Sequence, residues 1–231
     1  MRRIFWAGDS TVKTNKANTY PQTGIGQVFD RYTKPDVIIY NHAENGRSTK
    51  SFIDESRLAT IYNEITKDDF LFIQFGHNDE KDQDPARYTD PDGEYIVNLG
   101  KFVNVARNKG AYPVFITPLE RRLFNEDGSI VTPSAHLPYV NAMKKAGEKF
   151  DVPVVDLWSM SREFIEKTGD ADTIKYFMHL KKGEAKWKPE GQIDNTHLKG
   201  AGALVFAGMV AKGLVELGGI YKDLIFEDLE L

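Results

Sequence analysis

Five short apolar runs alternate along this chain with longer segments of helical spacing, and this alternation limits the fold more than any other feature. The apolar runs cover residues 4–7, 37–40, 70–75, 112–117 and 152–156. Helical segments are expected at about 26–32, 48–65, 94–108, 139–150, 158–168 and 198–217. Short apolar runs bounded by turn residues predict buried strands. Since no connection resembles a hairpin, we predict an α/β fold with a five-stranded parallel sheet and helices on both faces.

Size and charge narrow the class of protein further. The 231 residues, 41% of them apolar, suit one α/β domain with a single sizeable core. No repeat or linker divides the chain, so we predict one domain over residues 1–231. The net charge is −4, whereas a general nucleic-acid binder carries a basic face. No uninterrupted apolar run reaches the roughly 18 residues of a membrane span. We therefore expect neither nucleic acid nor a membrane as a partner.

The chain contains no cysteine. Disulfides, thiolate metal sites and cysteine nucleophiles are therefore excluded. Behind Met1, Arg2 and Arg3, only four or five apolar residues precede Asp9. That run is shorter than the apolar core of a signal peptide, which has about 7 to 15 residues. These features predict a cytoplasmic location as the default.

Polar clusters follow the first three predicted strands. They are Gly8-Asp9-Ser10, Asn45-Gly46-Arg47-Ser48 and Gly76-His77-Asn78-Asp79. In a parallel sheet the carboxyl ends of the strands lie at one edge, where ligands bind, so we expect the three clusters to meet. Each cluster alone has an ordinary structural explanation: Ser10 as a helix cap, and Asn78 and Asp79 as turn residues.

A fourth cluster, 194–197, precedes the last predicted helix and contains Asp194 and His197. At this spacing on a turn, the carboxylate of Asp194 can accept the Nδ1–H of His197, which leaves Nε2 free to take a proton. A serine hydroxyl is a poor nucleophile until such a base removes its proton. Ser10, His197 and Asp194 therefore suit acyl transfer. A capping or core role is the structural alternative for His197.

Acyl transfer also needs hydrogen-bond donors for the oxygen of the tetrahedral intermediate. We expect the backbone N–H groups of Ser10 and Gly46 and the side-chain amide of Asn78 to supply three. The loss of one such donor typically raises the barrier by about 2.7–4 kcal/mol. Asp79 is expected to be structural and to hold the loop by accepting hydrogen bonds.

The four clusters, in this order, resemble the four sequence blocks of the SGNH (GDSL-type) hydrolases. Within that superfamily, the segments Gly-Asp-Ser-Thr, Asn-Gly-Arg-Ser-Thr, Gln-Phe-Gly-His-Asn-Asp and Asp-Asn-Thr-His-Leu are similar to rhamnogalacturonan acetylesterases. The resemblance spans residues 8–197. It implies a flavodoxin-like three-layer α/β/α sandwich and the hydrolysis of acetyl esters on a pectin-derived carbohydrate, without a metal or another cofactor.

The resemblance also implies roles for single residues. Ser10 would be the nucleophile, His197 the base and Asp194 the orienting residue, with Ser10, Gly46 and Asn78 as the oxyanion site. The expected partner is an acetylated oligosaccharide or polysaccharide. Extracellular members carry a signal peptide and often disulfides, which are not seen here, so action on imported oligosaccharides is expected.

A pectin-derived substrate carries carboxylates, and a net-acidic protein must supply local positive charge to hold them. Arg47, Arg121 and Arg122 lie in loops expected at the edge of the site, and we predict that they bind substrate. His77 is expected to form a wall of the pocket. Trp187 suits either stacking on a sugar ring or packing.

Two alternatives remain from the sequence. One is an SGNH esterase or lipase with a different ester specificity, which an apolar acyl channel would favour. The other is a non-enzymatic flavodoxin-like module, either a flavin binder or a receiver-type signalling domain. In that module Asp9 and Asp79 would hold Mg²⁺, but Gly46, Asp194 and His197 would have no role.

Overall fold

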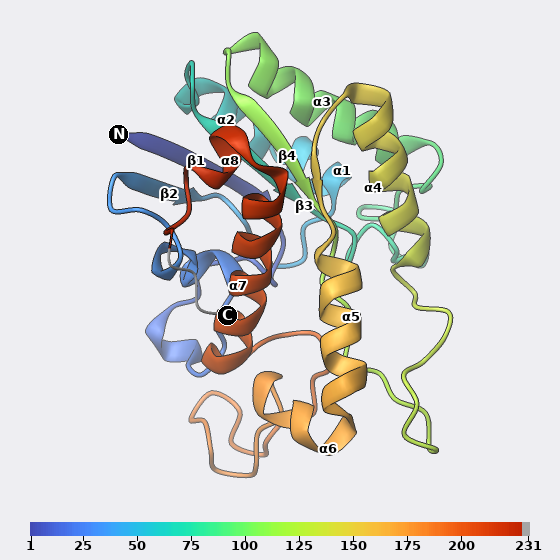
Figure 1. The fold of residues 1–231 in the computed structure, drawn as a ribbon. Helices are drawn as coiled ribbons and strands as arrows, with labels where there is room; N and C mark the ends of the chain where they lie inside the picture. Colours follow the sequence, from blue (N-terminus) through green and yellow to red (C-terminus); the bar gives the residue numbers. More distant parts are fainter. Residues whose placement is uncertain (228–231) are drawn as a thin grey trace.

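A five-stranded parallel sheet lies at the centre of the protein in the computed structural model, which describes residues 1–227 (Figure 1). Its strands are β1 (Arg2–Gly8), β2 (Val37–Asn41), β3 (Phe70–Gln74), β4 (Tyr112–Ile116) and β5 (Val154–Val155). Their order across the sheet is β2-β1-β3-β4-β5, and every neighbouring pair is parallel. This is the flavodoxin-like strand order. The predicted α/β fold with a five-stranded parallel sheet is confirmed.

Helices cover both faces of the sheet and complete the three layers. One face carries α1 (Thr49–Asp54), α2 (Arg57–Glu64), α3 (Glu94–Asn108) and α4 (Leu137–Phe150), and the other carries α5 (Leu157–Thr168) and α7 (Gly200–Leu217). Figure 1 shows α5 and α7 side by side in front of the sheet. Two short helices, α6 (Asp170–Thr173) and α8 (Gly219–Lys222), follow α5 and α7, and four 3₁₀ turns cover 17–19, 25–27, 29–31 and 174–176.

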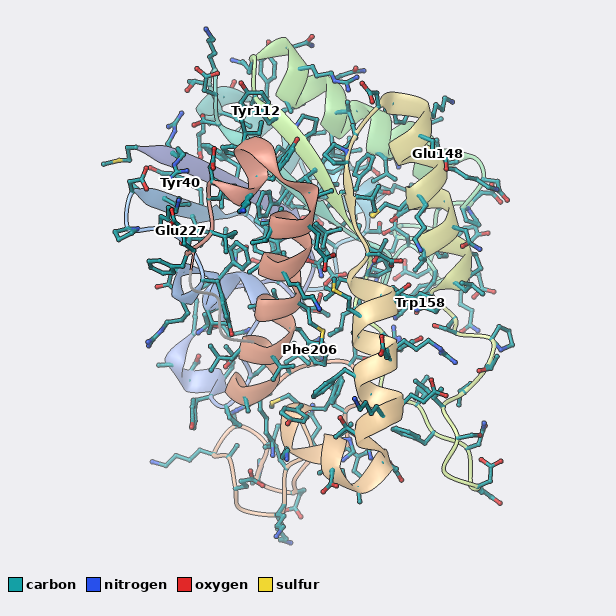
Figure 2. All side chains as sticks on the ribbon, in the orientation of Figure 1. Tyr40, Tyr112, Glu148, Trp158, Phe206 and Glu227 are labelled. Atoms are coloured by element: carbon teal, nitrogen blue, oxygen red, sulfur yellow. The ribbon has the colours of Figure 1, made fainter. Side chains whose placement is uncertain are left out.

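Alternate residues of β1, β3 and β4 enter opposite halves of the core, as expected for a period of two, whereas Ile38 and Tyr40 of the edge strand β2 are exposed. Trp6 and Phe72 face the α7 side, where both pack edge-on against Phe29. Phe206 of α7, labelled in Figure 2, packs edge-on against Phe164 of α5 on the same side. Phe5 and its alternate neighbours pack instead against α1 to α4. The inner strands are therefore buried on both faces, and this core fixes the positions of the loops that follow the strands.

Three elements differ from the sequence prediction. The helix expected at 26–32 forms two 3₁₀ turns, and Gly26 at its start has a low α-helix propensity. The helix expected at 48–65 is broken at Ser56, whose φ of 60° lies in the left-handed region. The fifth strand is only two residues long and lies at the sheet edge directly after Pro153, in agreement with the absence of an N–H on proline.

Helix α7 is, among residues 1–227, the one helix long and apolar enough to cross a membrane by length and composition. Half of its residues are buried within the protein. Its small residues allow close approach: a Cβ added at Gly213 would lie 2.4 Å from a methyl group of Val155 in β5. Helix α7 therefore packs as a core helix against the sheet.

Candidate active site

Ser10 lies directly after β1, at the carboxyl edge of the sheet. The backbone turns sharply there, because the carbonyl of Asp9 accepts hydrogen bonds from the N–H groups of Val12 and Lys13. The side chain of Asp9 supports the same turn by accepting from the N–H and the hydroxyl of Thr11. Oγ of Ser10 lies 2.8 Å from Nε2 of His197. The two residues predicted to meet therefore do so.

The carboxylate of Asp194 orients the ring of His197. Its Oδ2 lies 2.7 Å from Nδ1 of His197, and its Oδ1 accepts from the backbone N–H groups of Thr196 and His197. The side chain of Gln192 also donates to Oδ2. Burial alone would raise the pKa of Asp194, but His197 and these backbone donors hold it well below its ordinary value. Asp194 therefore stays ionised and fixes the tautomer in which Nε2 of His197 faces Ser10.

The segment that carries Asp194 and His197 is a turn before α7, not its first turn, because α7 begins at Gly200. Backbone hydrogen bonds attach this turn to two distant segments: Met178 donates to the carbonyl of His197, and Thr23 donates to that of Leu198. In Figure 1 the orange loop before α7 lies next to the blue segment after β1, which these contacts join. Isolated backbone bridges from two other segments thus hold the turn that carries His197.

The three expected oxyanion donors lie around the same hollow. Gly46 has φ +73°, a left-handed conformation that favours glycine. Within residues 1–227, the N–H groups of Ser10 and Gly46 donate no hydrogen bond to the protein. The amide of Asn78 is fixed in orientation, because its Nδ2 donates to the carbonyl of Arg47 at 3.1 Å and its Oδ1 accepts from Arg87 at 3.4 Å. A primary amide has two N–H bonds, so one N–H of Asn78 remains for an oxyanion.

Two buried carboxylates stabilise the loops behind these donors. Asp79 accepts from the N–H and hydroxyl of Thr49 and from the hydroxyl of Thr89. Burial raises the pKa of Asp79 to about 7 in spite of these hydrogen bonds. Asp9 lies 3.3 Å from Nδ1 of His77, and although burial opposes ionisation, His77 and Thr11 lower the pKa of Asp9. Asp79 is therefore structural, as expected.

The Mg²⁺ site of the alternative signalling module is not formed. Asp9 and Asp79 are 1% and 0% exposed, and protein donors bind both side chains. Among residues 1–227, no three His, Asp or Glu side chains are grouped as metal ligands.

The hollow that contains Ser10 and His197 has a volume of about 370 Å³ and a polar lining. Its walls are Ser10, Gln22, Asn45, Gly46, Asn78, Lys81, Arg87, Trp187, Lys188, Gln192, Asp194 and His197. Trp187 is the only large apolar side chain of this lining, and its Nε1 donates to the carbonyl of Tyr20.

The structure corrects three of the four predicted substrate-binding residues. Arg47 is absent from the lining, because its guanidinium pairs with Glu55 at 2.7 Å. His77 is 3% exposed and lies behind the site, beside Asp9. Arg122 is 5% exposed and binds Asp170, Thr173 and the side chain of Asn195. Its position supports the His197 turn, and its side chain is absent from the lining of the hollow.

Arg121, the fourth predicted residue, lines an adjoining hollow. Its guanidinium donates to Glu80 and to the hydroxyl of Thr196, the neighbour of His197. Arg121 therefore also supports the His197 turn.

Five further residues line the hollow and were not predicted from the sequence: Gln22, Lys81, Arg87, Lys188 and Gln192. Lys81 follows the Gly-His-Asn-Asp cluster closely, and Lys188 is adjacent to Trp187. Closeness in sequence to a recognised cluster was the one indication that Lys81 and Lys188 line the site. This indication was weak, because basic residues are frequent in loops.

Comparison with known proteins gives a family match and close relatives. A family model described as GDSL-like lipase/acylhydrolase matches residues 4–208. Rhamnogalacturonan acetylesterase RhgT of Bacillus subtilis (strain 168) is 40% identical over 221 residues, which cover 96% of this chain and 93% of that protein. Probable rhamnogalacturonan acetylesterase YesY of the same organism is 38% identical over 215 residues, which cover 93% of both chains.

Solved structures share the fold. Protein YXIM from Bacillus subtilis superposes with a TM-score of 0.79 at 23% identity, over 95% of this chain and 57% of that one. This chain therefore spans little more than half the length of that structure. Axe2, an acetylxylan esterase from Geobacillus stearothermophilus, superposes with a TM-score of 0.62 at 16% identity over 95% of each chain.

Proposed function

The chain belongs to the GDSL-like lipase/acylhydrolase family, and we propose that it is a serine esterase that removes acetyl groups from a pectin-derived, rhamnogalacturonan-type carbohydrate. It is a carboxylic ester hydrolase by its family and by its likeness to two proteins named as rhamnogalacturonan acetylesterases. One observation carries the proposed mechanism: Ser10, His197 and Asp194 are joined by hydrogen bonds of 2.8 Å and 2.7 Å.

In the first step, the acetyl carbonyl lies between Oγ of Ser10 and the three oxyanion donors. Oγ attacks the carbonyl carbon while Nε2 of His197 takes the hydroxyl proton. The carbonyl π electrons move to the oxygen, which the N–H groups of Ser10, Gly46 and Asn78 stabilise. The ionised Asp194 stabilises the imidazolium. The tetrahedral intermediate then expels the sugar oxygen, which takes the proton from His197, and acetyl-Ser10 remains.

In the second step, water replaces the sugar. His197 removes a proton from the water as its oxygen attacks the acetyl carbon of acetyl-Ser10. The second tetrahedral intermediate is stabilised by the same donors. Its collapse re-forms the carbonyl and breaks the bond to Oγ, the proton returns from His197 to Oγ of Ser10, and acetic acid leaves and loses its proton to solvent.

The lining of the hollow supports a sugar rather than a long acyl chain as the bound group. Sugar hydroxyls need hydrogen-bonding partners, and Gln22, Asn45 and Gln192 offer them beside Ser10. A lipase-like member of the superfamily would need an apolar channel, and the described lining of this hollow contains one large apolar side chain, Trp187.

The test is acetate release from a panel of acetylated polysaccharides and oligosaccharides, with a simple aryl acetate and aryl esters of longer acids for comparison. We expect the highest kcat/KM on acetylated rhamnogalacturonan fragments and no turnover by the Ser10→Ala variant. Faster hydrolysis of long-chain esters than of acetylated sugars would contradict the proposed substrate. Undiminished activity of Ser10→Ala would contradict the mechanism.

We also propose that the enzyme acts in the cytoplasm, on imported fragments generated during pectin degradation. The cysteine-free sequence supports this location, because secreted proteins are often cross-linked by disulfides. Fractionation of the producing cells tests this proposal, which predicts that the protein accompanies cytoplasmic markers. Recovery from the culture medium would contradict it.

A further inference from the structure

Three adjoining hollows form a groove at the carboxyl edge of the sheet. The central hollow contains Ser10 and His197. A second hollow of about 680 Å³ lies between the segment after β3 and the start of α4, and it shares Lys81 with the central one. A third hollow of about 510 Å³ shares Lys188, Gln192 and Asp194 with the central one. The reacting groups therefore lie in the middle of a groove that extends beyond a single sugar ring.

Lys81 lines both the central and the second hollow, and Lys188 lines both the central and the third hollow. Lys81 and Lys188 are exposed, and neither has an acidic partner within 4 Å among residues 1–227. In contrast, Lys182, which is also exposed and lies six residues before Lys188, pairs with Glu190 at 2.9 Å. The ammonium groups of Lys81 and Lys188 are thus available to a ligand that enters the groove.

Positive charge accumulates beside Lys81. Partial burial lowers the pKa of Lys81, the charges of Arg87 and Arg121 lower it further, and the charges of Glu80 and Asp84 act in the opposite direction. Arg87 lines the central hollow together with Lys81. A carboxylate placed between Lys81 and Arg87 would relieve this repulsion.

Among residues 1–227, the carboxylates around the groove neutralise Arg87 but form no ion pair with Lys81 or Lys188. Asp194 is hydrogen-bonded to His197, Glu80 is paired with Arg121 and His136, and Asp84 is paired with Arg87 through Nε. Asp82 has no such partner within the described chain, but it lines the second hollow and not the central one. The ammonium groups of Lys81 and Lys188 are therefore the places where an anionic ligand can form a direct ion pair at the central hollow.

We propose that Lys81, with Arg87, and Lys188 form two carboxylate subsites that flank Ser10 and bind free uronate groups of the sugar chain. This inference rests on the proposed carbohydrate esterase function and adds a specificity: the preferred substrate is an acetylated chain whose neighbouring uronates are not esterified. A carboxylate bound at either lysine would position the acetyl group over Ser10 through the rigid sugar backbone. The lysines act on binding and not on the bonds that break.

The experiment compares one acetylated rhamnogalacturonan oligosaccharide in two forms, with free carboxylates and with the same carboxylates methyl-esterified. The variants are Lys81→Gln, Lys188→Gln and the double variant, with Lys182→Gln as the matched control from the same surface. Kinetics are measured at low salt and at high salt. An aryl acetate and fluorophosphonate labelling of Ser10 report independently on the esterase machinery.

We expect each Gln substitution to raise KM for the free-carboxylate form about two- to fivefold, relative to KM for the methyl ester, because an exposed charge pair is worth that much in affinity. High salt should raise KM for the free-carboxylate form alone, since it screens such pairs. Lys81→Arg and Lys188→Arg should keep KM for the free-carboxylate form near the wild-type value. Lys182→Gln should leave KM unchanged for both forms of the substrate.

Equal KM values of the wild type for the two forms would overturn the inference. So would a Lys182→Gln effect as large as that of the other two substitutions. In either case, hydrolysis of both forms would leave the esterase function standing. Failure of the wild type to hydrolyse either form or the aryl acetate would instead overturn the proposed function.

Discussion

Oγ of Ser10 and Nε2 of His197 lie 2.8 Å apart, although the two residues are 187 positions apart in the chain. Ser10 lies at the start of the turn after the inner strand β1, and His197 lies on the turn before α7, which packs against the sheet. The contact therefore depends on the whole sandwich and not on any local motif.

The orienting role of the Asp194 carboxylate can be tested with a variant that keeps one side-chain oxygen. Asp194→Asn keeps one oxygen but can present an N–H to Nδ1 of His197, which favours the wrong tautomer. We expect kcat to fall by a factor on the order of 10⁴ with little change in KM. Steady-state kinetics on an aryl acetate measure this effect. A loss below about tenfold would show that Asp194 does not orient the base.

The side-chain donor of the oxyanion site is Asn78. Asn78→Ala removes one of three donors, so we expect kcat to fall by about 10²–10³, equivalent to about 2.7–4 kcal/mol of barrier. Far-ultraviolet circular dichroism should confirm that the variant folds. A rise in KM at constant kcat would instead assign Asn78 to ground-state binding.

Asp79 gives the protein a specific dependence of stability on pH. Because the pKa of Asp79 is raised to about 7 by burial, the folded protein keeps a proton that the unfolded chain loses near its ordinary pKa of about 4. The contribution of this group to the free energy of unfolding therefore falls as pH rises from about 4 to about 7, and it is constant above that window.

Asp79→Asn cannot ionise but retains the oxygen that accepts from Thr49 and Thr89. The free energy of unfolding of the variant minus that of the wild type should increase between about pH 4 and pH 8 by on the order of 1–4 kcal/mol. Urea denaturation at several pH values measures this difference. Parallel profiles for the two proteins would contradict the raised pKa.

The Arg122→Ala variant tests whether Arg122 supports the His197 turn or binds substrate. Arg122→Ala removes hydrogen bonds to Asn195 and Thr173, so we expect a loss of about 1–3 kcal/mol in stability and a lower kcat. Arg47→Ala is the control: its partly exposed ion pair with Glu55 should contribute less than about 1 kcal/mol. A large increase in KM without a loss of stability in Arg122→Ala would restore the original prediction that Arg122 binds substrate.

The parallel sheet and the meeting of the polar clusters could be predicted because each depends on a simple rule. Apolar runs separated by helical segments require parallel strands, and parallel strands bring the residues after β1, β2 and β3 to one edge. Asp194 and His197 are close in sequence, so their hydrogen bond followed from spacing alone. The family resemblance placed Gly46 and Asn78 beside them.

The directions of long basic side chains could not be predicted. Arg47 and Arg122 turn away from the hollow because Glu55 and Asp170 attract them. The sequence gives no sign of which acidic residue will lie within reach in the folded protein. Lys81 and Lys188 line the hollow for the converse reason: no carboxylate of the described chain holds them elsewhere.

The central claim is that Ser10 attacks the ester with His197 as its base. Peptide mapping by mass spectrometry after treatment with a fluorophosphonate tests it most directly. We predict one adduct, on Ser10, formed in parallel with the loss of esterase activity and absent from both Ser10→Ala and His197→Ala. Complete inactivation with the adduct on another residue, or full activity of the Ser10→Ala variant, would contradict the account.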